Sequence, residues 1–133
     1  MLSTFFKKGL GLGVLALCLN FPATVLAVSW EPVVESKSGN LTFYVDKDSL
    51  VRQGEIAYAW VESVERNYSG SLVNHLRSFI SIDCSTQQFR EREMYVFENG
   101  QVVAQRKLGN RGPLKAIVPG SMIEGVSDYV CGR

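Results

Sequence analysis

Residue types that carry out chemistry are scarce in this chain of 133 residues. It contains one histidine and three cysteines, and no two cysteines have the C-x-x-C spacing of a zinc or redox site. It also lacks a phosphate-binding loop and the pattern of an EF-hand calcium site. We therefore expect neither a cofactor nor a bound metal.

The single histidine offers one route to catalysis. His75 could join Ser78 or Ser81 and Asp83 in a Ser–His–Asp triad, but no nucleophile-elbow motif accompanies it. Paired carboxylates are a second route, and the candidates are spread over predicted strands and loops: Asp46, Asp48, Glu62 and Glu65. Their spacing does not require them to converge. Solvated surfaces explain these residues better, and we predict that the protein is not an enzyme.

Residues 1–27 have the three parts of a secretory signal peptide. Lys7 and Lys8 give a positive start, and residues 10–19 (LGLGVLALCL) form an apolar run shorter than the roughly 20 residues of a bilayer span. Small or compact residues precede a cleavage site after Ala27. The alternative is an uncleaved N-terminal anchor.

Cys18 lies in a sequence, Leu-Ala-Leu-Cys, that partly matches a lipoprotein signal. The residue before a lipidated cysteine is normally small, whereas here it is Leu17. Soluble export is therefore favoured over lipid anchoring, and the protein is predicted to reach the periplasm or the cell surface.

Residues 28–133 are enough for one domain. They carry 12 basic and 13 acidic side chains, because Lys7 and Lys8 lie in the signal. Such a balance gives no basic field to attract nucleic acid. The remaining cysteines, Cys84 and Cys131, are predicted to form a disulfide, as expected for an exported chain. A reactive or metal-binding cysteine pair is the competing interpretation.

Alternation of apolar and polar residues predicts several antiparallel strands. Pro32 indicates that the first is an edge strand, since proline cannot donate to a central ladder. Both faces of residues 56–64 carry apolar side chains, as expected of a strand covered on both sides. The predicted strands begin near Trp30, Leu41, Ile56 and Leu76, two more flank Asn99-Gly100, and residues 114–118 are a candidate short strand. Four aromatic residues are interpreted as core or rim packing: Trp30, Tyr58, Trp60 and Tyr68.

A hairpin is the clearest local signal. Asn99-Gly100 is a favoured pair for a two-residue turn, because both positions accept positive φ. The turn predicts four facing pairs beyond Glu98 and Gln101: Phe97 with Val102, Tyr95 with Ala104, Glu93 with Arg106, and Arg92 with Lys107. The sequence does not decide which hairpin face is buried.

The C-terminal segment predicts a short helix. Ser121 and Glu124 have the spacing of a capping box, and Gly132 can end the helix. An apolar stripe follows from Met122, Ile123, Val126, Tyr129 and Val130. So short a helix needs tertiary packing. The expected fold is therefore α+β, an antiparallel sheet of about five to six strands with a C-terminal helix tied to it by a disulfide.

Arg90 and Arg92 begin an alternating charge run on a predicted strand, and the hairpin brings them beside Arg106 and Lys107. The simpler interpretation is a soluble outer face. The sharper hypothesis is that these four residues form a face that binds a protein partner.

Several short motifs, in order, resemble the surface-adhesin protein E-like family of small exported bacterial proteins. They are Trp30, Phe43-Tyr44-Val45-Asp46 with Ser49-Leu50, residues 56–60, Ile82-Asp83-Cys84, Tyr95 with Gly100-Gln-Val-Val, and Pro119-Gly-Ser with Tyr129-Val-Cys131. The resemblance covers nearly all of residues 28–133.

The resemblance implies a sheet packed on a disulfide-tied C-terminal helix. It also implies an adhesin that binds host extracellular-matrix or serum proteins, and a homodimer. Binding residues cannot be carried over, because the matching motifs look structural, and fold alone does not imply function. A periplasmic accessory protein or enzyme inhibitor of the cell envelope is the alternative.

Overall fold

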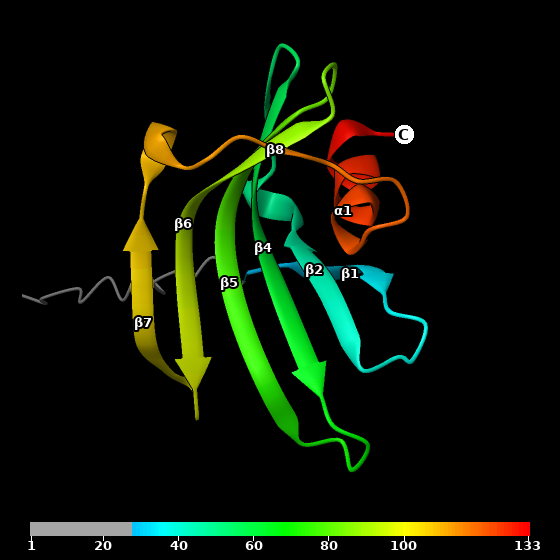
Figure 1. The fold of residues 1–133 in the computed structure, drawn as a ribbon, viewed down its shortest axis with the longest axis vertical. Coiled ribbons are helices and arrows are strands. Elements are labelled where there is room, and N and C mark those ends of the chain that lie inside the picture. The colour runs from blue at the N-terminus through cyan, green and yellow to red at the C-terminus, as the bar shows by residue number, and fades with distance from the viewer. Residues whose placement is uncertain (1–27) are drawn as a thin grey trace, which may run out of the picture.

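The computed structural model describes residues 28–133, and Figure 1 shows their fold. The predictions for residues 1–27, namely the signal peptide, the cleavage after Ala27 and the question of Cys18, lie outside the described residues. Within residues 28–133, helices long and apolar enough to cross a membrane are absent.

The described residues form one antiparallel sheet and one α-helix, as the α+β prediction expected. The eight strands are β1 (Trp30–Glu35), β2 (Leu41–Asp46), β3 (Val51–Gln53), β4 (Ile56–Arg66), β5 (Leu72–Asp83), β6 (Gln88–Glu98), β7 (Gln101–Lys107) and β8 (Lys115–Ala116). Helix α1 spans Met122–Cys131, and two 3-10 turns, η1 and η2, span Lys47–Ser49 and Gly109–Arg111.

The strand count exceeds the five to six that were predicted. Six strands form the main path in the order β1-β2-β4-β5-β6-β7, and two short strands lie off it. Strand β3 has three residues and pairs with β4, whereas β8 has two and pairs with β6. Strand β8 falls within the short strand predicted at residues 114–118, whereas β3 carries too little alternation to be recognised before its partner is known. The start of β5 was also predicted four residues late, at Leu76 rather than Leu72.

Helix α1 packs on one face of the sheet, against β1, β2 and β4 (Figure 1). The most buried residues on this side are small or branched: Val45, Ala57, Ala59, Val61, Ile80, Ile82, Ile117, Val126 and Val130. Alanine at two alternate positions of β4 lets the helix approach the backbone closely. Val126 and Val130 belong to the predicted apolar stripe, and its Ile123 and Tyr129 pack beside them.

The predicted disulfide is present between Cys84 and Cys131, with the two Cα atoms 5.7 Å apart. It joins the end of β5 to the last residue of α1. A second link joins the helix to β1, where the Tyr129 hydroxyl donates to Glu31 Oε2 at 2.8 Å. This hydrogen bond lowers the pKa of Glu31, helped by Lys47, and raises the pKa of Tyr129. The helix is thus fastened at two separate strands.

The helix begins and ends where the sequence indicated, but the predicted capping box is wrong. Ser121 is the N-cap residue, yet its hydroxyl donates to the Val118 carbonyl and accepts no helix N–H. Glu124 reaches back to the amide of Gly120 at 3.3 Å, one residue before the cap. Gly132 ends the helix with a positive φ of 72°, as predicted.

The hairpin turn was predicted correctly and its register was not. Asn99 and Gly100 both have positive φ, and Phe97 pairs with Val102. Val96 then pairs with Ala104, which leaves Val103 as an extra residue in a β-bulge. All later pairs shift by one residue: Tyr95 with Gln105, Met94 with Arg106, and Glu93 with Lys107. The unfavourable pairing of Arg92 with Lys107 is thereby avoided.

Candidate functional site

The face of the sheet opposite α1 is rich in aromatic residues, and we call it the open face. On β4, Ala57, Ala59 and Val61 point into the helix-side core, so the alternate residues Tyr58, Trp60 and Glu62 point the other way. The described helix covers only the first side. The prediction that β4 would be covered on both sides is therefore wrong: its second apolar face is partly exposed.

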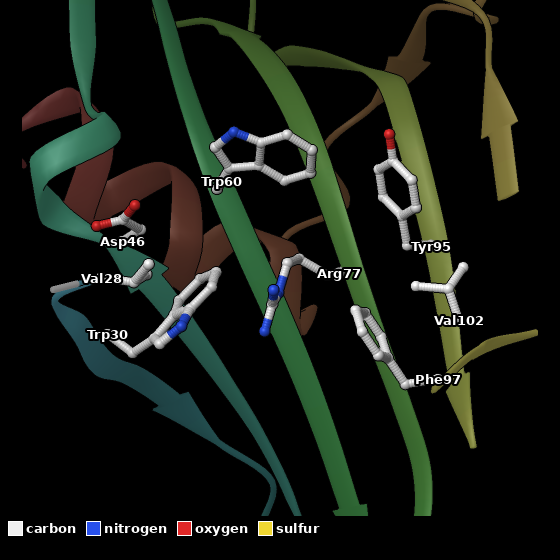
Figure 2. Close-up of a pocket in the computed structure, with 8 residues that line it drawn as sticks. All are labelled: Val28, Trp30, Asp46, Trp60, Arg77, Tyr95, Phe97 and Val102. Atoms are coloured by element: carbon white, nitrogen blue, oxygen red, sulfur yellow. The ribbon is translucent and has the colours of Figure 1, made fainter. Parts of the chain in front are cut away.

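A groove of about 410 Å³ lies on the open face. Figure 2 shows its lining side chains, which come from β1, β2, β4, β5, β6, β7 and the residues before β1: Val28, Trp30, Asp46, Trp60, Arg77, Tyr95, Phe97 and Val102. The groove thus crosses the full width of the main strand path. Four of the eight lining residues are aromatic and two are valines, and the other two are one cation and one carboxylate.

The aromatic rings contact one another across neighbouring strands. The Trp60 ring lies 5.3 Å from that of Phe79 and 5.9 Å from that of Tyr95, measured between centroids. Tyr58 stacks on the other side of Phe79 at 6.2 Å. Because cross-strand aromatic pairs stabilise antiparallel sheets, this row holds its shape without a covering layer.

Arg77 lies at the centre of the groove (Figure 2). Its guanidinium carbon is 5.1 Å from the ring centroid of Trp30 and 4.9 Å from that of Phe97. The two rings therefore hold the cation from β1 and β6 while Arg77 itself belongs to β5. Its Nε atom is buried and has no hydrogen-bond partner among the described residues.

Glu62 neutralises Arg77 from the neighbouring strand. Its side chain is 10% exposed, and its Oε1 atom accepts from Arg77 at 3.0 Å and contacts His75 Nε2. The His75 ring stacks on Phe97 at 4.7 Å. A carboxylate buried this far requires such partners. Glu62 therefore holds Arg77 in place in the groove.

His75 does not meet the residues of the suggested triad. Ser78 lies on the helix side of β5, beside Ile123, whereas His75 points to the open face. Asp83 is at the far end of β5, where the Ser85 hydroxyl and the Thr86 amide lower the pKa of its carboxyl group. Clusters of three or more histidine, cysteine or acidic residues suited to a metal ion are absent from residues 28–133.

The four basic residues of the predicted partner face do not all share one side of the sheet. Arg90 and Arg92 line a second hollow of about 300 Å³ on the open face, where Arg92 lies over Tyr58 at 5.6 Å. Lys107 shares that face through its pairing with Glu93. Arg106 pairs with Met94, which faces the helix side. Arg106 therefore stands apart from the other three.

The groove was not predicted from the sequence. Trp30 and Trp60 were interpreted as core or rim packing, and they are rim residues that contact Arg77 or the aromatic row. Tyr68 is instead fully exposed in the loop after β4. The available signal was the apolar alternation on both sides of β4, because the sequence of residues 28–133 predicts only one helix to cover two such faces.

The described residues thus form a single sheet with one face closed by a disulfide-tied helix and one open aromatic face. Residues 30–132 match the family described as surface-adhesin protein E. The match spans well over half of the chain, so the protein belongs to this family, as the resemblance predicted. No curated protein sequence and no solved structure matches the chain.

Proposed function

We propose that the protein is an exported, non-enzymatic binding protein of the adhesin type, whose open face contacts a protein partner. Its membership of the surface-adhesin protein E family supports this function. The observation that carries it is the groove, in which Trp60 and Tyr95 contact each other and Arg77 lies between Trp30 and Phe97, yet Trp60, Tyr95 and Arg77 stay only half-buried. Tryptophan, tyrosine and arginine are the residues most enriched in binding hot spots.

The proposed partners are host extracellular-matrix or serum proteins. Rigid aromatic rings give a partner contact area at low entropic cost, and Arg77 is already oriented by Trp30 and Phe97. Because Glu62 neutralises Arg77, the groove favours apolar side chains over strongly charged ones. By analogy with the family we also propose a homodimer, in which a second copy of the chain covers the open face.

The proposed partners are extracellular, so the proposed function requires export of the domain. We propose that a signal peptidase cleaves after Ala27 and that residues 28–133 reach the periplasm or the cell surface. Fractionation of the native host with protease treatment of intact cells separates the two locations. Digestion of the protein on intact cells supports the adhesin, whereas protection until the outer envelope is opened favours an accessory protein or inhibitor.

Binding to a panel of immobilised extracellular-matrix and serum proteins tests the function directly. We expect saturable binding by the wild type, and a loss of about 2 kcal/mol, or roughly 30-fold in affinity, for Trp60→Leu or Trp30→Leu. Tyr68→Ala is the matched control, because this exposed aromatic residue lies outside the groove. Thermal melts verify folding. Absence of saturable binding to every protein of the panel would reject adhesion.

A further inference from the structure

Strand β7 is an exposed edge of the sheet. It ends the strand order and pairs with β6 alone among the described strands. All seven of its residues are exposed, including Val102 at 49% and Val103 at 53%. An edge with accessible backbone groups and apolar side chains is a template for another strand.

The hydrogen-bond pattern shows which backbone groups of β7 are free to pair outward. The Leu108 amide donates to the Arg92 carbonyl, so Glu93 and Lys107 form a non-hydrogen-bonded pair. Residues in such pairs direct their N–H and C=O groups away from the neighbouring strand. Gln105, two residues earlier, has the same orientation. Gln105 and Lys107 therefore present their backbone donors and acceptors at the edge.

The two edges of the sheet differ in protection. Strand β1, at the other edge, contains Pro32 and a bulge at the next residue, and α1 packs against it. Proline, bulges and covering elements are the usual protections of edge strands. Strand β7 has a bulge at Val103, but its last four residues, 104–107, are regular, contain no proline and lie far from α1 (Figure 1).

The charge at this edge selects the chemistry of an incoming segment. Arg106 and Lys107 form no salt bridge with the described residues, and their side chains lie on opposite faces of β7. Glu93 faces Lys107 across the hairpin, and Arg106 faces the uncharged Met94. Acidic side chains on two successive residues of an added strand would meet both cations. Apolar residues further along would meet Val102, which also lines the groove.

We propose that β7 receives an extended, acidic–apolar segment of the partner protein as an additional antiparallel strand. Main-chain hydrogen bonds to Gln105 and Lys107 supply affinity, and side chains at alternate positions supply specificity. The N-terminal part of the segment carries the acidic residues, because an antiparallel strand begins opposite Lys107. This inference rests on the proposed function and specifies how the partner reaches the groove.

A synthetic peptide tests the proposal. The probe is acetyl-Asp-Glu-Thr-Val-Thr-Val-Thr-amide, titrated into ¹⁵N-labelled protein of residues 28–133 and followed by NMR. We expect saturable shifts of the amide signals of Gln105 and Lys107. A peptide with Lys-Lys in place of Asp-Glu should bind at least about tenfold more weakly, and higher salt should reduce this difference. A peptide N-methylated at its pairing amides should not bind.

A matched pair of variants locates the binding edge. Gln105→Pro removes an N–H group that does not pair with β6, so the hairpin should remain folded while strand addition is lost. Gln105→Ala keeps the N–H group and should bind the peptide like the wild type. If Gln105→Pro does not fold, the N-methylated peptide provides the same comparison on the unchanged protein.

Three results would overturn the proposal. The first is equal binding of the acidic and lysine peptides, and the second is wild-type peptide binding by folded Gln105→Pro. The third is a concentration-dependent dimer that Gln105→Pro abolishes, because a second copy of the chain would then occupy the edge.

The proposed function fails separately. If Trp60→Leu loses binding to a matrix or serum protein and Gln105→Pro does not, the open face is the binding site and strand addition is wrong. If no protein of the panel binds but the peptide does, adhesion is wrong and the edge remains a binding site.

Discussion

Gly125 in α1 lies directly against β1, and replacing it with alanine sets two effects against each other. Alanine favours a helix interior by about 1 kcal/mol over glycine. However, a Cβ atom at this position would lie 2.7 Å from Val34 Cβ and 2.9 Å from Val34 Cγ2. Contacts this short force a shift, and overpacking of this kind typically costs about 1–3 kcal/mol.

The steric effect should be the larger one, because Val34 Cβ is fixed to the strand backbone and cannot move aside as the end of a flexible side chain could. We expect Gly125→Ala to lower the free energy of unfolding by about 1 kcal/mol, and the melting temperature by about 4–8 °C for a domain of this size. Urea unfolding followed by circular dichroism measures both the free energy and the slope.

Val34→Gly provides the decisive background, since it removes the nearest atom of the contact. In this background Gly125→Ala should raise the free energy of unfolding by about 1 kcal/mol, because only the helix propensity remains. The reasoning is refuted if Gly125→Ala stabilises the protein that retains Val34, or if its effect is the same in both backgrounds.

Three further perturbations test how the fold is held together. Replacing both Cys84 and Cys131 with serine should lower the free energy of unfolding by about 4 kcal/mol, the chain-entropy value for a separation of 47 residues, measured by urea unfolding. Tyr129→Phe should flatten the pH dependence of stability. Because the pKa of Glu31 is lowered, its carboxylate stabilises the fold above the ordinary glutamate pKa of about 4.3, and this stability is lost as the pH falls through the lowered pKa. Because the pKa of Tyr129 is raised, its hydroxyl contributes stability that is lost as the pH rises above about 10. Melting curves from pH 3 to 11 would contradict this if both proteins changed in parallel. Glu62→Gln should cost about 1–3 kcal/mol, because it weakens hydrogen bonds to Arg77 and His75, and an unchanged urea midpoint would show that the buried carboxylate is dispensable.

Much of the fold followed from local patterns in the sequence. The Asn99-Gly100 turn, the helix ending at Gly132 and the Cys84–Cys131 disulfide were predicted because each depends on a short motif or on compartment and cysteine count. Pro32 likewise identified an edge strand. Such signals do not require knowledge of distant neighbours.

The errors arose where distant neighbours decide the local structure. The bulge at Val103 is not marked by glycine or proline, so the hairpin register was wrong beyond the first two pairs. Strand β3 is recognisable only through its pairing with β4. The Ser121 hydroxyl donates to the Val118 carbonyl, which lies outside the helix, and the S-x-x-E spacing does not indicate this hydrogen bond.

The groove depends most strongly on tertiary structure. Arg77 belongs to β5, and its two aromatic neighbours, Trp30 and Phe97, come from β1 and β6. The sequence separates these residues by 47 and 20 positions, and only the strand order brings them together. The predicted basic face grouped Arg106 with its neighbour Lys107, although adjacent residues of a strand point to opposite faces in either register, and Arg106 accordingly lies on the other side.

Side-chain footprinting with hydroxyl radicals tests the binding role of the open face most directly. The oxidation of Trp30, Trp60 and Tyr95 is compared by mass spectrometry in the free protein and in its complex with a bound matrix or serum protein. The open-face account predicts protection of these three residues, with Tyr68 and the helix residue Met122 unchanged. Protection at Met122 and not in the groove, or no protection of the aromatic residues in a saturated complex, would contradict it.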